Sequence, residues 1–178
     1  MRTQQGTPVR REAYQPLAYG GETVDLDLLL DPKATQVSSR LVCVRNADAS
    51  AGPIVLFGEA LELVSLSIDG AVPADGQVRK TDTGLEIDVS AERVVLDIVT
   101  RIDPSANLTL SGLYQSRGGY YTQCEAEGFR RITYFIDRPD VMARYPVRLE
   151  ADAAVCPVLL SNGNLLETGS LPNGRHFA

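Results

Sequence analysis

Hydrophobic and polar residues alternate through the first two thirds of the chain. The clearest case is residues 23–30, where Val24, Leu26, Leu28 and Leu30 alternate with mostly polar neighbours. Successive side chains of a β-strand point to opposite faces, so this period of two predicts a strand with one face buried. Further extended runs are predicted at residues 36–45, 53–57, 61–68, 85–89, 93–102, 108–114, 146–151, 157–161 and 165–167.

Turn-forming pairs separate these runs. They include Asp31-Pro32, Gly52-Pro53, Asp69-Gly70, Thr83-Gly84 and Asp103-Pro104. The best-supported hairpin turn is Asp69-Gly70, between Ile68 and Val72, because an Asp-Gly pair suits a two-residue turn. Many short strands at close spacing predict an all-β fold, either an antiparallel β-sandwich or a barrel.

The period changes after residue 125. Phe129, Ile132, Phe135 and Ile136 have the spacing of one face of a helix. The Arg138-Pro139 pair should end that helix, because a residue before proline disfavours helical geometry. We therefore expect one short helix near residues 126–137 in an otherwise all-β domain.

Length and composition favour a single domain. A chain of 178 residues, 44% of them hydrophobic and 22% charged, is typical of one globular unit. Residues 1–21 are polar and interrupted by proline and glycine, so they predict an N-terminal tail or extended lead-in. Residues 22–178 are expected to form a single β domain. The last residues show no capping pattern, so we expect a C-terminally truncated piece of a longer protein.

Charge and cysteine usage exclude several partners. The net charge is −6 and no run of Lys or Arg occurs, which argues against a nucleic-acid partner. No stretch approaches the ~20 apolar residues that span a bilayer, so no membrane association is predicted. Cys43, Cys124 and Cys156 are irregularly spaced without a CxxC pair. This pattern indicates reduced thiols and a cytoplasmic location.

Most catalytic chemistries lack their residues here. A catalytic zinc site needs three protein ligands, commonly histidines in an HExxH motif, and the single histidine is His176. That residue also stands in no motif with a serine or cysteine nucleophile. Gly118-Gly119 matches neither phosphate-binding spacing and is more consistent with a loop tip. We expect no catalytic residue, no metal ligand and no bound cofactor in this chain.

One acceptor pair remains, formed by Gln123 and Glu125. The two residues stand two apart where a predicted strand meets the predicted helix, so their side chains should project to the same side. An amide oxygen beside a carboxylate suits an ammonium group, which offers only hydrogen-bond donors. The alternative is an ordinary strand end or a helix-capping contact.

Nearby charges have simpler explanations. Glu127 is expected in the first turn of the predicted helix, where a negative charge is favourable. Arg130 and Arg131 are expected to pair with Asp137 or Asp140.

Ordered motifs across the chain carry a resemblance to a known family. They are LSGLYQS (110–116), YTQCEAEGFRRITYFIDRPDVMARYPVRLEAD (121–152), CPVLLSNGN (156–164), NGRH (173–176) and, more loosely, YQPLAYGGETVDLDLLLDP (14–32) and LVCVRNADA (41–49). In this order they resemble the N-terminal domain of the zinc aminopeptidase N family, especially its soluble bacterial branch.

The resemblance implies a saddle-like β domain placed over a thermolysin-like catalytic domain. Gln123 and Glu125 match residues that, with a glutamate of the GxMEN motif in the catalytic domain, hold the free amine of a peptide substrate. The zinc and its HExxH ligands belong to that other domain, so the fragment alone should be inactive. Related leukotriene hydrolases have Gln at the position of Glu125, which favours a peptidase that removes N-terminal amino acids.

A stand-alone β-sandwich module that binds carbohydrate or protein is the alternative function. Such a module usually exposes aromatic side chains, and Tyr120 with Tyr121 is the adjacent aromatic pair outside the predicted helix. GxMEN and HExxH motifs downstream in the coding sequence would favour the peptidase, and a stop codon would favour the module.

Overall fold

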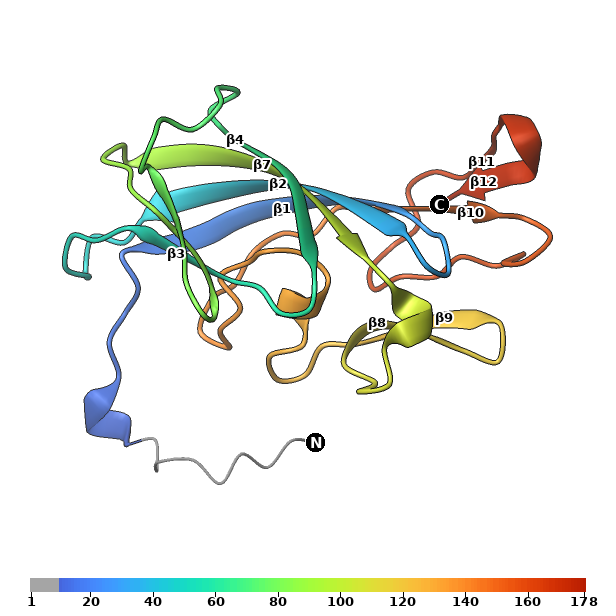
Figure 1. The fold of residues 1–178 in the computed structure, drawn as a ribbon, viewed down its shortest axis with the longest axis horizontal. Coiled ribbons are helices and arrows are strands. Elements are labelled where there is room, and N and C mark those ends of the chain that lie inside the picture. The colour runs from blue at the N-terminus through green and yellow to red at the C-terminus, as the bar shows by residue number, and fades with distance from the viewer. Residues whose placement is uncertain (1–9) are drawn as a thin grey trace.

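A large mixed sheet is the main layer of the fold. The computed structural model describes residues 10–178, and in these residues seven strands form one sheet in the order β11-β12-β10-β1-β2-β7-β4 (Figure 1). The strands are β1 (Tyr19–Leu29), β2 (Thr35–Arg45), β4 (Glu62–Ile68), β7 (Arg93–Ile102), β10 (Val147–Asp152), β11 (Gly169–Ser170) and β12 (Arg175–Phe177). The pairing is antiparallel except between β1 and β10, which run parallel.

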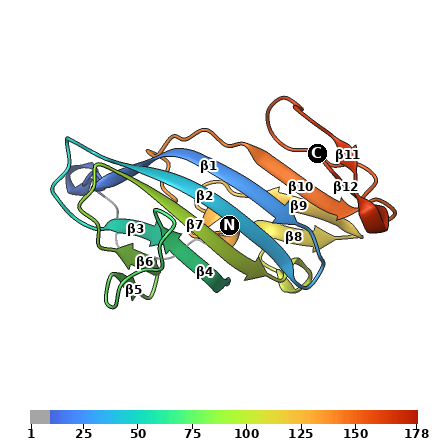
Figure 2. The same ribbon diagram turned by 90° about the horizontal axis from the view of Figure 1, so that it is seen from above.

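Smaller elements cover one side of this sheet (Figures 1 and 2). One is a three-stranded sheet of β3 (Ile54–Phe57), β6 (Gly84–Ile87) and β5 (Val78–Lys80). The other is a hairpin of β8 (Gly112–Ser116) and β9 (Gly119–Gln123). The helices of the described residues are short 3-10 turns, η1 (Arg11–Ala13), η2 (Pro104–Ala106), η3 (Phe129–Arg131) and η4 (Pro172–Gly174).

The core lies between these two layers. Alternate residues of the central strands are buried, and Val24, Leu41, Leu96 and Ile98 are each 1% exposed or less. Burying one such side chain contributes about 1.5–3 kcal/mol. The opposite face of the sheet is charged, with ion pairs such as Arg40–Asp97 at 3.1 Å. The predicted one-sided burial of these strands is therefore confirmed, as is the all-β, sandwich-like fold class.

The predicted helix near residues 126–137 is much shorter in the structure. It consists of the 3-10 turn η3, and residues 132–137 that follow are all buried. Phe135 instead lies extended beside Phe57, with backbone N–H to O distances of 2.7 and 3.1 Å in the two directions. A segment enclosed on all sides cannot be recognised by one-faced periodicity, so the helical spacing was misleading.

Two buried hydroxyl groups fasten this segment to the large sheet. Thr100 Oγ1 donates to the carbonyl oxygen of Ile132 at 3.0 Å, and Ser39 Oγ lies 3.1 Å from Thr133 Oγ1. Buried polar groups need such partners, so these bonds fix where the segment crosses the sheet.

Other predictions need correction. β1 begins at Tyr19, within the predicted lead-in of residues 1–21; residues 1–9 of that lead-in lie outside the described part of the chain. The Asp69-Gly70 turn is present, with φ of 51° and 79°, but its second arm is a single bridge at Ala71.

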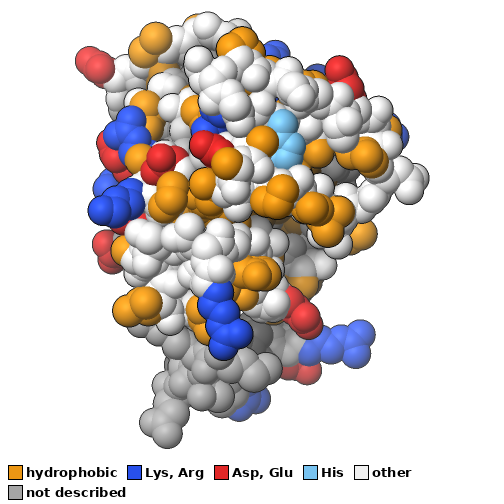
Figure 3. Space-filling model, turned by 90° about the vertical axis from the view of Figure 1, so that its right-hand side faces the viewer, with side chains coloured by type: hydrophobic (Ala, Val, Ile, Leu, Met, Phe, Trp, Pro, Cys, Tyr) orange, Lys and Arg blue, Asp and Glu red, His pale blue; other side chains and the backbone are white. Residues whose placement is uncertain are grey.

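The strands predicted at residues 157–161 and 165–167 are absent from the described structure. Leu160 and Leu166 in these runs are 84% and 92% exposed. Hydrophobic side chains are indeed frequent on the face shown in Figure 3. Apolar composition alone therefore predicted strands that the fold does not form.

Candidate functional site

The acceptor pair lies at the root of the β8–β9 hairpin. The tip of the hairpin is a two-residue turn at Arg117 and Gly118, whose φ values of 49° and 84° suit that turn type. At the other end, Gln123 is the last residue of β9 and pairs with Gly112, the first residue of β8. Gln123 is thus held near the body of the domain, far along the hairpin from its tip.

Glu125 follows in a tight turn. The N–H of Gly128 donates to the carbonyl oxygen of Cys124 at 2.8 Å, which closes the turn, and the Glu125–Ala126 peptide bond is cis. The side-chain amide of Gln123 donates to the backbone oxygen of Glu125 at 3.5 Å. Both side chains are exposed, and within residues 10–178 the carboxylate of Glu125 forms no ion pair or hydrogen bond. The structure thus leaves both side chains open to solvent, and the Gln123 amide contacts the backbone of Glu125.

A hollow of about 610 Å³ lies on the other side of β9. Thr122 and Cys124 contribute to its lining, whereas Gln123 and Glu125 do not. Neighbouring side chains of a strand point in opposite directions, which explains this division. Burial, together with the charge of Asp137, raises the pKa of Cys124 to about 11, so its thiol stays protonated near neutral pH.

The turn is clamped on one side by Arg130 and Asp137, a pair that the sequence predicted. The carboxylate of Asp137 accepts from Arg130 Nε at 2.9 Å and from its backbone N–H at 3.0 Å, and Asp137 is only 7% exposed. The guanidinium also lies 4.5 Å from the ring centre of Phe57. Glu127, expected in a helical turn, instead pairs with Arg130 at 3.3 Å.

Arg131 pairs differently from the prediction. Its guanidinium forms an ion pair with Glu59, and its Nε donates to the carbonyl oxygen of Ser111 at 3.1 Å. Asp140, its other predicted partner, pairs with Arg138 at 2.8 Å. Glu59 stands 72 residues away from Arg131 in sequence, and no local pattern links the two.

Other candidate chemistry is sparse. The ring of His176 lies 2.7 Å through Nε2 from the carbonyl oxygen of Cys156, and it tethers the 153–168 segment to β12. Within residues 10–178, no three His, Cys, Asp or Glu side chains gather as metal ligands would. No helix in that range has the length and apolarity needed to cross a bilayer.

Comparison with known proteins identifies similar chains. The family model described as the Peptidase M1 N-terminal domain matches residues 16–178. Aminopeptidase N of Caulobacter vibrioides is 48% identical over all of this chain, and that of Escherichia coli is 43% identical over 98% of it. The chain spans only 20% of the length of each of these relatives.

Solved structures agree with this similarity. The structure of Legionella pneumophila aminopeptidase A in complex with aspartic acid superimposes with a TM-score of 0.85 at 32% identity, over 93% of this chain and 20% of that one. An M1 zinc metallopeptidase from Deinococcus radiodurans gives a TM-score of 0.72 over 92% of this chain and 38% of that one. Its identity of 17% supports the likeness of fold alone.

Proposed function

Because the chain belongs to the peptidase M1 N-terminal domain family, we propose that it is the N-terminal domain of a zinc-dependent aminopeptidase N. In this proposal the complete enzyme removes N-terminal amino acids from peptides, and this domain supplies part of the site that binds the free α-amine. Its partners are the peptide N-terminus and a thermolysin-like catalytic domain of the same polypeptide.

The observation that carries the proposal is the exposed acceptor pair at the hairpin root. The carboxylate of Glu125 has no cationic partner among residues 10–178, and the side-chain amide of Gln123 bonds to the backbone oxygen of the same residue. A protonated amine offers three donors and no acceptor, so it complements these oxygens. A hydrogen bond between two charged groups is also roughly twice as strong as a neutral one.

Amine binding at this position gives exopeptidase selectivity through geometry. A fixed site for the chain start determines how far the peptide reaches, so only its first peptide bond meets the hydrolytic groups. A catalytic zinc takes three protein ligands, commonly including histidines. The one histidine of this chain lies 2.7 Å from a backbone oxygen, which supports placing the zinc elsewhere in the enzyme. We therefore assign the zinc to the catalytic domain and no catalytic residue to this one.

The test is Glu125→Ala in the complete enzyme. In the complete enzyme the bound peptide and the catalytic domain would cover Glu125, and removing one partner of a largely buried ion pair costs about 3–5 kcal/mol. The value of kcat/KM for aminoacyl substrates should therefore fall roughly 100- to 5,000-fold. Glu127→Ala is the matched control, because this exposed glutamate stands two residues away and its pairing contributes at most about 1 kcal/mol. A loss below fivefold in Glu125→Ala would refute the assigned role.

A further inference from the structure

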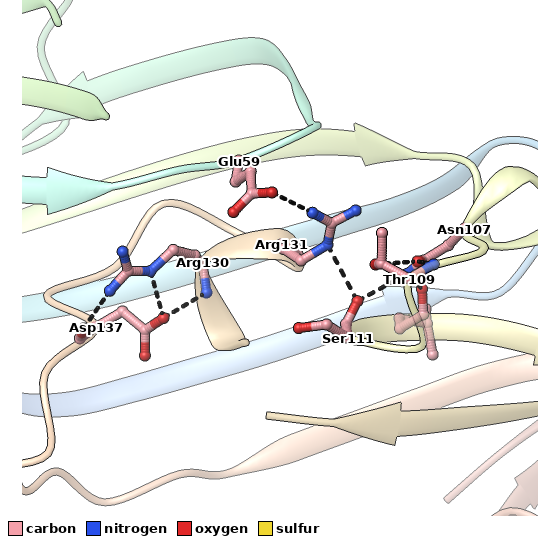
Figure 4. A network of polar contacts seen from close by, with 8 residues as sticks. Glu59, Asn107, Thr109, Ser111, Arg130, Arg131 and Asp137 are labelled. Atoms are coloured by element: carbon pink, nitrogen blue, oxygen red, sulfur yellow. Dashed lines mark hydrogen bonds and ion pairs between the residues drawn. The ribbon is translucent and has the colours of Figure 1, made fainter. Parts of the chain in front are cut away.

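The root of the β8–β9 hairpin is tied to the rest of the domain through Arg131 (Figure 4). We propose, on the basis of the amine-binding role proposed above, that Arg131 is a positioning residue that holds Gln123 and Glu125 where the amine must bind. Arg131 touches neither acceptor side chain in the hydrogen-bond network. Its effect runs through the backbone on which both residues stand.

The first step is the link between Arg131 and the turn that carries Glu125. The N–H of Arg131 donates to the carbonyl oxygen of Gly128 at 3.1 Å, and the N–H of Gly128 donates to that of Cys124 at 2.8 Å. Two successive backbone bonds therefore connect Arg131 to the residue between Gln123 and Glu125.

Close packing makes this link rigid. A Cβ atom added to Gly112 would stand 2.6 Å from Cβ of Arg131, and one added to Gly128 would stand 2.6 Å from the carbonyl oxygen of Gln123. Both distances are shorter than atoms tolerate, so no free space separates these three segments. A shift of Arg131 is consequently passed on to the hairpin root.

The guanidinium of Arg131 fixes this packed unit to the loop between β3 and β4. Its Nε bonds to Ser111, directly before β8, while its Nη1 pairs with Glu59, in the loop between β3 and β4. The side chain of Arg131 is only 13% exposed. The Ser111 oxygen also accepts from the side-chain amide of Asn107 at 2.8 Å, so two donors hold it.

The neighbouring Arg130 serves a different purpose. Figure 4 shows the two guanidinium groups directed to opposite sides, that of Arg130 toward Asp137 and that of Arg131 toward Ser111 and Glu59. Arg130 clamps the chain after the turn, whereas Arg131 clamps the hairpin before it. Arg131 is therefore the one bonded directly before β8, whose first residue, Gly112, pairs with Gln123.

The experiment measures how much the α-amine contributes to binding in the complete enzyme. Alanine hydroxamate and propionohydroxamate differ only in that amine. The inhibition constant of propionohydroxamate divided by that of alanine hydroxamate therefore measures how much the amine contributes to binding. This ratio does not depend on the fraction of folded enzyme, and a variant that is merely less stable leaves it unchanged. We expect Arg131→Met to lower the ratio at least about tenfold. The variant removes the bonds that hold the hairpin root, so the charge-assisted bond between the amine and Glu125 loses its geometry.

Reference variants give the outcome its meaning. Glu125→Ala should lower the ratio most, and Arg101→Met should leave it within about twofold, because Arg101 is 46% exposed and pairs with Glu62 on the outer face of the sheet. A normal ratio in Arg131→Met, with a low ratio in Glu125→Ala, would overturn the positioning role and leave the proposed function intact. A normal ratio in Glu125→Ala would instead overturn the proposed function.

A second variant covers the case in which Arg131→Met does not fold. Glu59→Gln keeps the size of the partner side chain and removes its charge. It should lower the ratio at least about threefold, since an ion pair is replaced by a neutral hydrogen bond. An unchanged ratio in folded Glu59→Gln would likewise overturn the role assigned to Arg131.

Discussion

Replacing Asp137 by alanine should destabilise the domain by a calculable amount. The change removes two hydrogen bonds to Arg130, at 2.9 and 3.0 Å, each worth about 1.5–3 kcal/mol because a charge takes part. Arg130 keeps a bond of 2.8 Å to the backbone oxygen of residue 137 and its pairing with Glu127, which offset part of the loss. Since the guanidinium is only 16% exposed, we expect a net loss of about 3 kcal/mol, at the lower end for a broken buried pair.

Equilibrium unfolding of the chain in urea measures this loss. With a dependence on urea of about 2 kcal/mol per molar, the midpoint should fall by about 1.5 M. Asp97→Ala is the matched control, because Asp97 pairs with Arg40 at 3.1 Å on the solvent-facing side and should cost at most about 1 kcal/mol. Equal shifts in the two variants would contradict the reasoning, which assigns the difference to burial.

Two further changes test other parts of the structure. Gly128→Ala should lower the free energy of unfolding by about 1–3 kcal/mol, since the new methyl group would stand 2.6 Å from the backbone oxygen of Gln123. Gly20→Ala, at a position with open space around it, should change this free energy by less than about 1 kcal/mol in the same urea assay. Glu150 tests the pH dependence of stability. Its hydrogen bond with Arg175 holds the pKa of this carboxyl below its ordinary value, although partial burial acts in the opposite direction. The contribution of Glu150 to the free energy of unfolding is therefore complete above the ordinary carboxyl range and is lost as the pH falls through the lowered pKa. Glu150→Gln should therefore narrow the difference between urea midpoints at pH 6 and pH 3, and an unchanged difference would refute this assignment.

Local patterns predicted those parts of the fold in which one face is buried. β2 and β7 match their predicted ranges within one residue, because their inward residues alternate with charged ones such as Arg40 and Asp97. Such patterns are uninformative where burial is not one-sided. Residues 132–137 are enclosed by both layers, and their apolar spacing therefore imitated a helix. Leu160 and Leu166 caused the opposite error, because their apolar runs predicted buried strands although both side chains are exposed.

In the candidate site, too, contacts within a short stretch of sequence were predictable and contacts between distant segments were not. The acceptor pair and the Arg130–Asp137 contact lie within a short stretch of sequence, so residue types and spacing were enough to suggest them. The partners of Arg131 could not be found in this way. Glu59 becomes its neighbour only after β3 pairs with the segment at residue 135, a contact between segments far apart in the chain.

Gln123 lies at the base of its hairpin, at the opposite end from the turn. An arm that swings about its base moves most at its free end, and residues beside the pivot hardly travel. Movement or a change in length at the Arg117-Gly118 end would therefore displace Gln123, which we propose helps to bind the amine, only slightly. The tip of the hairpin can thus tolerate changes of sequence or length, while the position of Gln123 at its base is preserved.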